Sequence, residues 1–170
     1  MQRVLVIGAG GAGKSSFAAR LSRTYGLPLI HLDALYWKPG WVETNKAEWQ
    51  ERVGQLVGGD RWVMDGNYGG TLDQRIAACD TVVFLDMPRL LCLGRALRRY
   101  VRHRGHSRPD MTAGCPERLS FAFLWWIWTY PSKRRPQILS RLGALSSEQR
   151  VVILRSDAEI DAFIGAGASA

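Results

Sequence analysis

Short apolar runs alternate along the chain with longer stretches in which apolar residues recur every three or four positions. The short runs are rich in β-branched residues and are bounded by polar or glycine positions, which is typical of buried strands. They lie at Arg3–Ile7, Leu29–Leu32, Trp62–Met64, Thr81–Leu85 and Arg150–Leu154. Because strands that alternate with helices favour βα units, the pattern predicts an α/β fold with a mostly parallel sheet.

The longer stretches carry the residues that start and end helices. The stretch after the first strand places Phe17, Leu21 and Tyr25 on one face and then reaches Gly26, a residue type that commonly ends a helix. Three further helices are expected where a Ser, Thr or Asn is followed three positions later by Glu or Gln, because such pairs cap a helix N-terminus. These pairs are Asn45 with Glu48, Thr71 with Gln74, and Ser156 with Glu159.

An arginine-rich segment separates the last two expected strands. A long helix is expected from Met87-Pro88 through Arg102, then an irregular stretch, and then a second helix from Leu119 to Tyr130 that ends at Pro131. The second helix carries an apolar stripe that is expected to be core, with a base-stacking platform as the alternative. The stripe consists of Phe121, Leu124, Trp125 and Trp128.

Glycines crowd the end of the first strand, where they weaken both strand and helix. Their spacing, Gly8-x-x-x-x-Gly13-Lys14-Ser15, supplies a reason. In a phosphate-binding loop, small residues let backbone N–H groups turn toward an anion, the lysine reaches the β- and γ-phosphates, and the hydroxyl, here of Ser15, binds Mg²⁺. The spacing therefore predicts that a nucleoside triphosphate is bound by Gly8, Ala9, Gly10, Gly11, Ala12, Gly13, Lys14, Ser15 and Ser16.

Three expected strands end in an aspartate, and ligands of open α/β sheets collect at that edge. Asp65 is followed by a glycine, which lets a backbone come close to a ligand, so we assign Asp65 to the metal or the substrate. Asp33 precedes Tyr36 and Trp37, which are expected to line an acceptor pocket with Asp33 as its anchor or catalytic base. Asp86 precedes a helix, and we expect it to cap that helix.

The strand ends also bear on the kind of reaction. Hydrolysing motor proteins commonly have a second acidic residue directly after the strand-end aspartate, whereas Gly66 and Met87 stand there in this chain. A guanine-reading Asn-Lys-x-Asp motif is absent, since the stretch at 45–48 ends in glutamate and comes too early. Transfer of a phosphoryl group to an acceptor is therefore favoured over hydrolysis or a GTP switch.

The positive charge of the chain is concentrated in one segment. The whole chain has a net charge of +8, and residues 89–135 alone carry ten arginines and Lys133 against Asp110 and Glu117, a net charge of +9. Fixed cations offset the charge of a transferring phosphoryl group. We therefore expect catalytic roles for several arginines, on one helix face and on a mobile lid that excludes water. These are Arg95 and Arg99 on the helix, beside Arg98 and Arg102, and Arg104 and Arg108 on the lid.

Composition adds the cellular setting. At 170 residues, 46% hydrophobic and 22% charged, the chain is ordinary globular material for one domain. The first strand begins at once, so no signal peptide is expected, and the longest apolar run is too short to span a membrane. Three cysteines without close pairing fit reduced thiols. We expect a cytoplasmic protein with no membrane partner.

No linker or internal repeat divides the chain. We predict one kinase-like domain over residues 1–164, with an acceptor-binding region at about 33–59 and a lid at about 103–118. Residues 165–170 are small and glycine-rich, and they are expected to form a flexible tail.

Together these residues resemble the adenylate-kinase-like P-loop proteins, and most closely the bacterial DNA topology modulation proteins. The resemblance runs from residue 1 to about residue 155 and is carried by "GAGGAGKSSFA", "LPLIHLDALYWKPGW", "WVMDGNYGGTLDQRI", "FLDMPRLLCLGRALRR", "RGHSRPDMTAGCPERL" and "RPQIL". It implies a P-loop NTPase fold, that is, a three-layer α/β/α sandwich with a five-stranded parallel sheet and a helical, arginine-rich lid insertion. It also implies ATP with Mg²⁺.

The resemblance points to further substrate residues. The stretch "DGNYGGTLDQR" stands where nucleotide kinases have Asp-Gly-Phe-Pro-Arg, which implies substrate contacts by Asn67 and Arg75. Asn67 and Tyr68 replace Phe-Pro and no arginine follows them directly, which argues against a nucleoside monophosphate acceptor. The stretch "HLDALYW" is closer to the substrate aspartate of shikimate and gluconate kinases.

Two functions stay open at this point. The first is an ATP-dependent phosphotransferase that acts on a small hydroxylated or phosphorylated acceptor. The second is an ATP-binding, nucleic-acid-associated regulator that uses residues 89–135 as a surface for the phosphate backbone.

Overall fold

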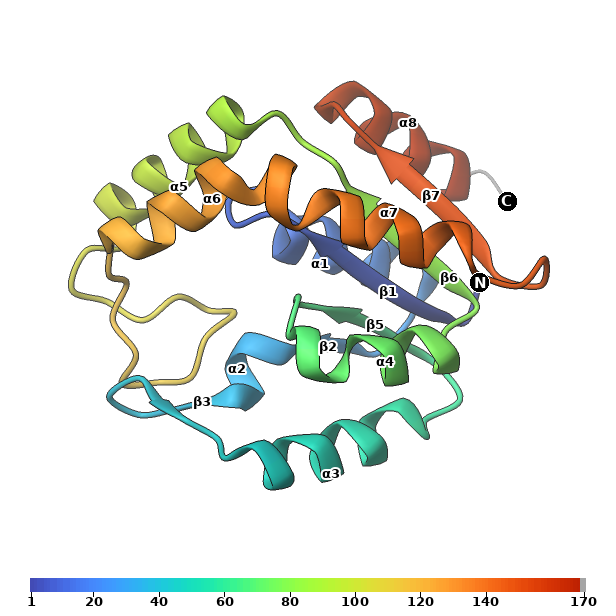
Figure 1. Cartoon of the computed structure of the whole chain (residues 1–170), viewed down its shortest axis with the longest axis horizontal. Coiled ribbons are helices and arrows are strands. Elements are labelled where there is room, and N and C mark those ends of the chain that lie inside the picture. The colour runs from blue at the N-terminus through green and yellow to red at the C-terminus, as the bar shows by residue number, and fades with distance from the viewer. Residues whose placement is uncertain (169–170) are drawn as a thin grey trace.

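The structure, a computed structural model, describes residues 1–168. Its central sheet has five parallel strands, β1 (Arg3–Gly8), β2 (Leu29–His31), β5 (Trp62–Asp65), β6 (Thr81–Leu85) and β7 (Arg150–Leu154), in the order β2-β5-β1-β6-β7. In Figure 1, α1 (Lys14–Tyr25) lies behind this sheet, and α4 (Leu72–Ala78) and α7 (Arg135–Gly143) lie in front of it. The expected α/β/α architecture with a five-stranded parallel sheet is confirmed.

The strand register brings the chemically active ends of the strands together. Asp65 at the end of β5 pairs with Val6 of β1 on one side and with His31 of β2 on the other. Gly8, where the phosphate loop begins, pairs with Leu85 at the end of β6. The loop therefore starts at the centre of the sheet edge where ligands of such folds collect.

The core is built around β1, whose residues Val4, Leu5 and Val6 have no exposed surface. A strand covered by helices on both faces has no solvent-facing side, so it consists of consecutive apolar residues. On α1, Phe17 and Leu21 are buried against the sheet, as their spacing predicts.

Three of the five expected helix caps are observed, and the two exceptions are Thr71 and Asp86. Gly26 ends α1 with φ 61, and the Asn45 side chain accepts a hydrogen bond from the Glu48 N–H at the start of α3 (Lys46–Val57). In the same way, the Ser156 hydroxyl accepts a hydrogen bond from the Glu159 N–H at the start of α8 (Asp157–Ala168). The Thr71 hydroxyl donates instead to the Tyr68 carbonyl oxygen, because a 3-10 turn over Gly69–Thr71 leads into α4.

Of the two helices in the arginine-rich segment, the second ends later than expected. The first, α5, spans Arg89–His103, close to its predicted bounds, but the second, α6, spans Phe121–Lys133 and continues through Pro131. Proline removes one hydrogen bond of a helix, and the burial of Ile127 and Tyr130 just before it keeps the last turn on the core.

The apolar stripe of α6 is not core. Phe121 is 80% exposed, Trp125 53% and Trp128 40%, whereas Ile127 and Tyr130 on another face of the helix are buried. The helix is therefore oriented about its axis so that Ile127 and Tyr130 face the core and the stripe faces outward.

The C-terminal helix extends past the point where a tail was expected. Residues 165–168 belong to α8, and a Cβ added to Gly167 would lie 1.8 Å from the Tyr25 hydroxyl oxygen. The missing side chain thus allows α8 to approach α1 closely, and the expected tail is wrong for these four residues. Residues 169–170 lie outside the described part of the chain.

Candidate active site

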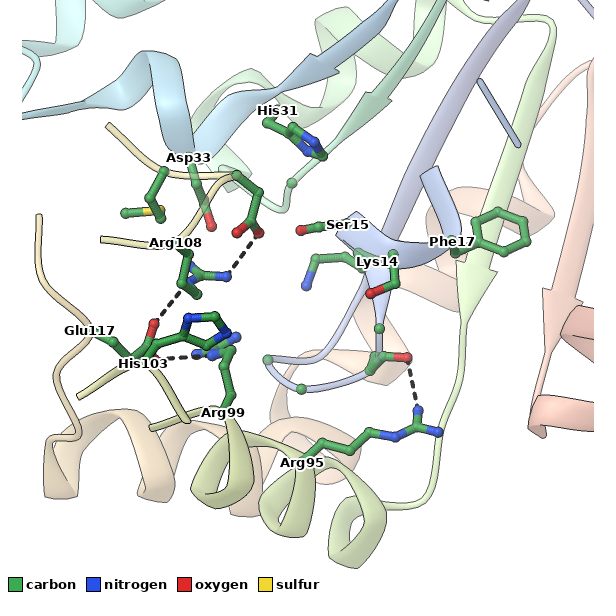
Figure 2. A pocket seen from close by; sticks show the side chains of 18 of the residues that line it. Lys14, Ser15, Phe17, His31, Asp33, Arg95, Arg99, His103, Arg108 and Glu117 are labelled. Carbon is green, nitrogen blue, oxygen red and sulfur yellow. Dashed lines mark hydrogen bonds and ion pairs between the residues drawn. The ribbon is translucent and has the colours of Figure 1, made fainter. Parts of the chain in front are cut away.

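A cleft of about 1020 Å³ lies at the carboxyl edge of the sheet, bordered by the phosphate loop, α5, the lid and α2 (Leu32–Tyr36). In Figure 2, Lys14 and Ser15 lie on one side of this cleft, Asp33 and Arg108 lie together on the opposite side, and Arg95 and Arg99 come from α5. Of the expected nucleotide-binding residues, Gly10 through Ser16 line it. Gly8 and Ala9 do not line the cleft. The backbone of Gly8 forms hydrogen bonds with the Asn67 side chain amide, and the carbonyl oxygen of the buried Ala9 accepts a hydrogen bond from Lys14.

The phosphate loop depends on glycine at two positions in particular. Gly11 has φ +76, and a Cβ there would lie 2.1 Å from the Cys92 carbonyl oxygen of α5. Gly13 has φ +95 directly before α1. Both φ values are ones that side-chain-bearing residues rarely adopt, and at Gly11 a side chain would also collide with the backbone of α5.

Lys14 reaches into the cleft from the start of α1. Its Nζ donates a hydrogen bond to the Ala9 carbonyl oxygen at 3.0 Å. Burial lowers the pKa of this ammonium, and the carboxylates of Asp33 and Asp65 oppose that shift. A cation with one neutral oxygen as its hydrogen-bond partner is suited to binding an incoming anion such as phosphate.

Three side chains from three elements form a hydrogen-bonded row beside Lys14. The Ser15 hydroxyl donates to Asp65 Oδ2 at 2.8 Å, and His31 Nδ1 lies 2.6 Å from Asp65 Oδ1. This hydrogen bond raises the pKa of His31. Both oxygens of the buried Asp65 carboxylate are thereby fixed in direction. Sequence reasoning missed His31, although its position at the end of a strand is the signal that singled out Asp65.

The same row fits a magnesium ion. Mg²⁺ prefers oxygen ligands and is usually held by one or two protein groups together with substrate phosphates and water. Ser15 and Asp65 supply such oxygens side by side. Within the described residues, no three His, Cys, Asp or Glu side chains gather to hold a metal without such help.

Asp33 lies in the cleft at the start of α2 and has one fixed partner. The Tyr68 hydroxyl donates to Asp33 Oδ1 at 2.7 Å, and burial raises the pKa of Tyr68, which keeps it a donor. Trp37 also lines the cleft. Tyr36 does not: its hydroxyl donates to Glu43 and its ring packs on Trp49, which corrects its expected place in the acceptor pocket.

Arg75 is a structural residue rather than a substrate contact, which corrects the implied role. Its side chain has no exposed surface, and the guanidinium donates to the carbonyl oxygens of Gly66, Asn67, Tyr68 and Thr71. Burial lowers its pKa to about 10, so it stays charged at neutral pH. Arg75 thus fixes the loop after β5, from which Asn67 reaches the phosphate loop and Tyr68 reaches Asp33.

Three of the arginines that line the cleft, Arg95, Arg99 and Arg108, are held by carboxylates. Arg95 makes two hydrogen bonds of 2.6 Å to Asp157 at the start of α8. Arg99 and Arg108 both pair with the buried Glu117, at 3.0 and 2.7 Å. In Figure 2, Glu117 lies between these two guanidinium groups. Glu117 was not foreseen as a site residue, because an acid in a basic segment is unremarkable in sequence.

Two charged residues lie elsewhere than expected. Arg104 directly follows α5, and its side chain is exposed and does not line the cleft, which corrects its catalytic assignment. Asp86 caps no helix: its carboxylate binds Arg135 through two guanidinium nitrogens.

The lid crosses the acceptor side of the cleft. The Thr112 hydroxyl lies within hydrogen-bond distance of the carbonyl oxygens of Ala34 (2.7 Å) and Trp37 (2.6 Å). In the turn between β3 (Trp37–Lys38) and β4 (Val42–Glu43), a short hairpin absent from the expected elements, the Trp41 indole N–H donates to the Pro116 carbonyl oxygen at 3.0 Å. The lid and the acceptor region therefore close the cleft together.

No family model and no curated protein matches the chain in sequence. Solved structures do match in shape. A shikimate kinase from Bacteroides thetaiotaomicron has a TM-score of 0.61 and 17% identity, covering 97% of this chain and 95% of that one. A shikimate kinase from Acinetobacter baumannii in complex with shikimate has a TM-score of 0.58 and 16% identity, and the match covers 98% of this chain and 90% of that one. A gluconokinase from Sinorhizobium meliloti 1021 has a TM-score of 0.52 and 19% identity, and the match covers 99% of this chain and 91% of that one.

These identities are low, and what they show is the fold. The neighbours cover nearly the whole chain, the lid included. Within residues 1–168, no helix is long and apolar enough to cross a membrane. The chain has the three-layer α/β/α fold of P-loop kinases.

Proposed function

We propose that this protein is a cytoplasmic, ATP-dependent phosphotransferase that moves the γ-phosphoryl group of Mg-ATP to a small acceptor. One observation carries the proposal: the phosphate loop with Ser15, Asp33 and the arginines Arg95, Arg99 and Arg108 all line one cleft, and the buried Asp65 lies directly behind Ser15. Shikimate kinases and a gluconokinase of the same fold act on small hydroxylated acids, which supports a small hydroxyl acceptor.

Each group of residues in the cleft has a separate role in this reaction. Backbone N–H groups of the loop and the Lys14 ammonium bind the phosphates, and Ser15 and Asp65 would hold Mg²⁺, which would supply positive charge to offset that of the phosphates. Asp33, oriented by Tyr68, accepts the proton of the acceptor hydroxyl. Arg95 and Arg99 lie across from Lys14 and offset charge on the transferring group, while the lid excludes water.

The nucleic-acid alternative has less support. Arg95, Arg99 and Arg108 turn into the cleft and pair with carboxylates, so they are not part of an outward phosphate-binding surface. The resemblance to DNA topology modulation proteins stays a prediction. A direct test of the proposed function is to measure ATP consumption and phosphorylated product with nucleosides, nucleotides, sugars and small acids. If ATP neither binds nor is consumed with any acceptor class, the proposal fails.

Asp33→Asn is expected to lower acceptor phosphorylation by about 10²-fold, because the amide no longer takes the hydroxyl proton. ATP binding should be unchanged, since Asp33 lies on the acceptor side. Product formation and ATP titration measure the two effects. Asp73→Asn on the exposed face of α4 is the matched control and should behave as wild type. A wild-type transfer rate in Asp33→Asn would contradict the assignment of the base.

His31→Ala is expected to raise the Mg²⁺ concentration needed for ATP binding by about tenfold, because partners that orient a metal ligand contribute about that much to metal affinity. The readout is the thermal stabilisation by ATP at increasing Mg²⁺, which needs no turnover. His106→Ala is the control, since His106 is exposed on the lid and lies outside the cleft. An unchanged Mg²⁺ requirement would show that Asp65 is oriented without His31.

A further inference from the structure

The outward faces of α5 and α6 form one apolar surface away from the cleft. The two helices lie side by side, and the Arg89 guanidinium of α5 stacks on the Trp128 ring of α6 at 4.2 Å, so the surfaces of the two helices meet (Figure 1). Most of the large apolar side chains that are exposed within residues 1–168 lie here. We call this the α5–α6 face; its members are Leu90, Leu91, Leu97, Val101, Phe121, Trp125 and Trp128.

The exposure is too large to be incidental. Leu90 is 70% exposed, Val101 76% and Phe121 80%. On α5, the positions 90, 97 and 101 recur at helical spacing and form a continuous stripe. A contiguous apolar patch of this kind commonly marks a surface that contacts another molecule.

The charges around the α5–α6 face are all positive. Neither helix contains an Asp or Glu. The acids of the segment between residues 89 and 135 are Asp110 and Glu117, and both turn to arginines of the cleft side. The exposed basic residues on and beside the two helices that lie outside the cleft are Arg89, Lys133 and Arg134, while the exposed Arg98 and Arg102 of α5 line the cleft.

We infer that the α5–α6 face docks on an anionic lipid surface. Apolar and aromatic side chains beside cationic ones, on helices that lie flat, are typical of interfacial membrane contact, with Trp at the headgroup level. Cationic residues add attraction to anionic headgroups. A second copy of this chain would bring the same positive charges against the face, which disfavours a dimer here. The sequence led us to expect no membrane partner because no stretch could span a bilayer, but surface docking needs no spanning helix.

Co-sedimentation with vesicles tests the inference. Wild-type protein should bind phosphatidylglycerol-containing vesicles at least tenfold more tightly than pure phosphatidylcholine vesicles, with weaker binding at high salt. Trp125→Ser with Trp128→Ser should weaken binding to anionic vesicles by about tenfold. A second variant on the other helix, Leu90→Gln with Val101→Gln, should do the same. Val42→Ser, an exposed apolar residue on β4, is the matched control and should bind as wild type.

Several results would overturn the inference. These are no binding to anionic vesicles at low salt, equal binding to both vesicle types, or unchanged binding in both double variants. Light scattering and a single-stranded oligonucleotide titration complete the experiment. A dimer, or an oligonucleotide complex, that is lost in these variants while vesicles are not bound would assign the face to a second copy or to nucleic acid instead.

Discussion

Lys14→Ala is expected to reduce phosphoryl transfer by about 10³-fold or more while leaving the fold intact, because its ammonium is the cation that the loop directs at the phosphates. The expectation that the fold stays intact follows from the pKa of Lys14. Burial lowers the pKa of Lys14, so the folded state binds its proton less well than the unfolded state. This difference opposes folding at every pH below the unfolded value of 10.5. Removing the cation should therefore not destabilise the protein.

Thermal unfolding with and without Mg-ATP separates the two effects. A ligand at a hundred times its dissociation constant stabilises a protein by about 2.7 kcal/mol, or about 5–10 °C for a chain of this size. The unfolding temperature of the wild type should rise by this amount when Mg-ATP is added. Lys14→Ala should lose most of this rise, while its unfolding temperature without ATP should be equal to or higher than that of the wild type. Lys46→Ala, exposed on α3, should respond as wild type. If Lys14→Ala kept both transfer and the ATP-induced rise, the phosphate loop would have another role.

Local patterns predicted the parts of the site that lie within a few residues of one another. The loop from Gly8 to Ser15 is set by glycine positions, a lysine and a hydroxyl within one short stretch, and the structure places it at the end of a buried strand as expected. The strands themselves follow from apolar runs, since a strand covered on both faces has no polar side.

Contacts between residues that are far apart in the sequence could not be predicted from local sequence patterns. Asp65 and His31 meet because β2 pairs with β5, and strand order is not encoded in periodicity. Glu117 reaches Arg99 only because the lid folds back on α5. Helical spacing likewise marked the stripe of α6 but did not say which side of that helix faces the core.

Arg75→Met is expected to destabilise the protein by about 3–5 kcal/mol, because four carbonyl oxygens lose their donor inside the fold. Each buried acceptor left unpaired costs about 1–3 kcal/mol, and water that enters the space can restore part of the loss. Chemical denaturation measures the change. Arg141→Met is the matched control: this arginine pairs with Asp73 at the surface, and an exposed pair contributes less than about 1 kcal/mol.

The same variant tests what the buried cation does for the site. The loop that Arg75 fixes carries Asn67, whose side chain amide donates to the Gly8 carbonyl oxygen at 2.8 Å, and Tyr68, which orients Asp33. If Arg75 positions this loop, Arg75→Met should weaken ATP-induced stabilisation and acceptor phosphorylation together at temperatures where the variant is still folded. Arg75→Lys should recover only part of both, since a lysine cannot reach four diverging carbonyl oxygens. A variant as stable as Arg141→Met, with full activity, would mean that the loop keeps its shape without the guanidinium.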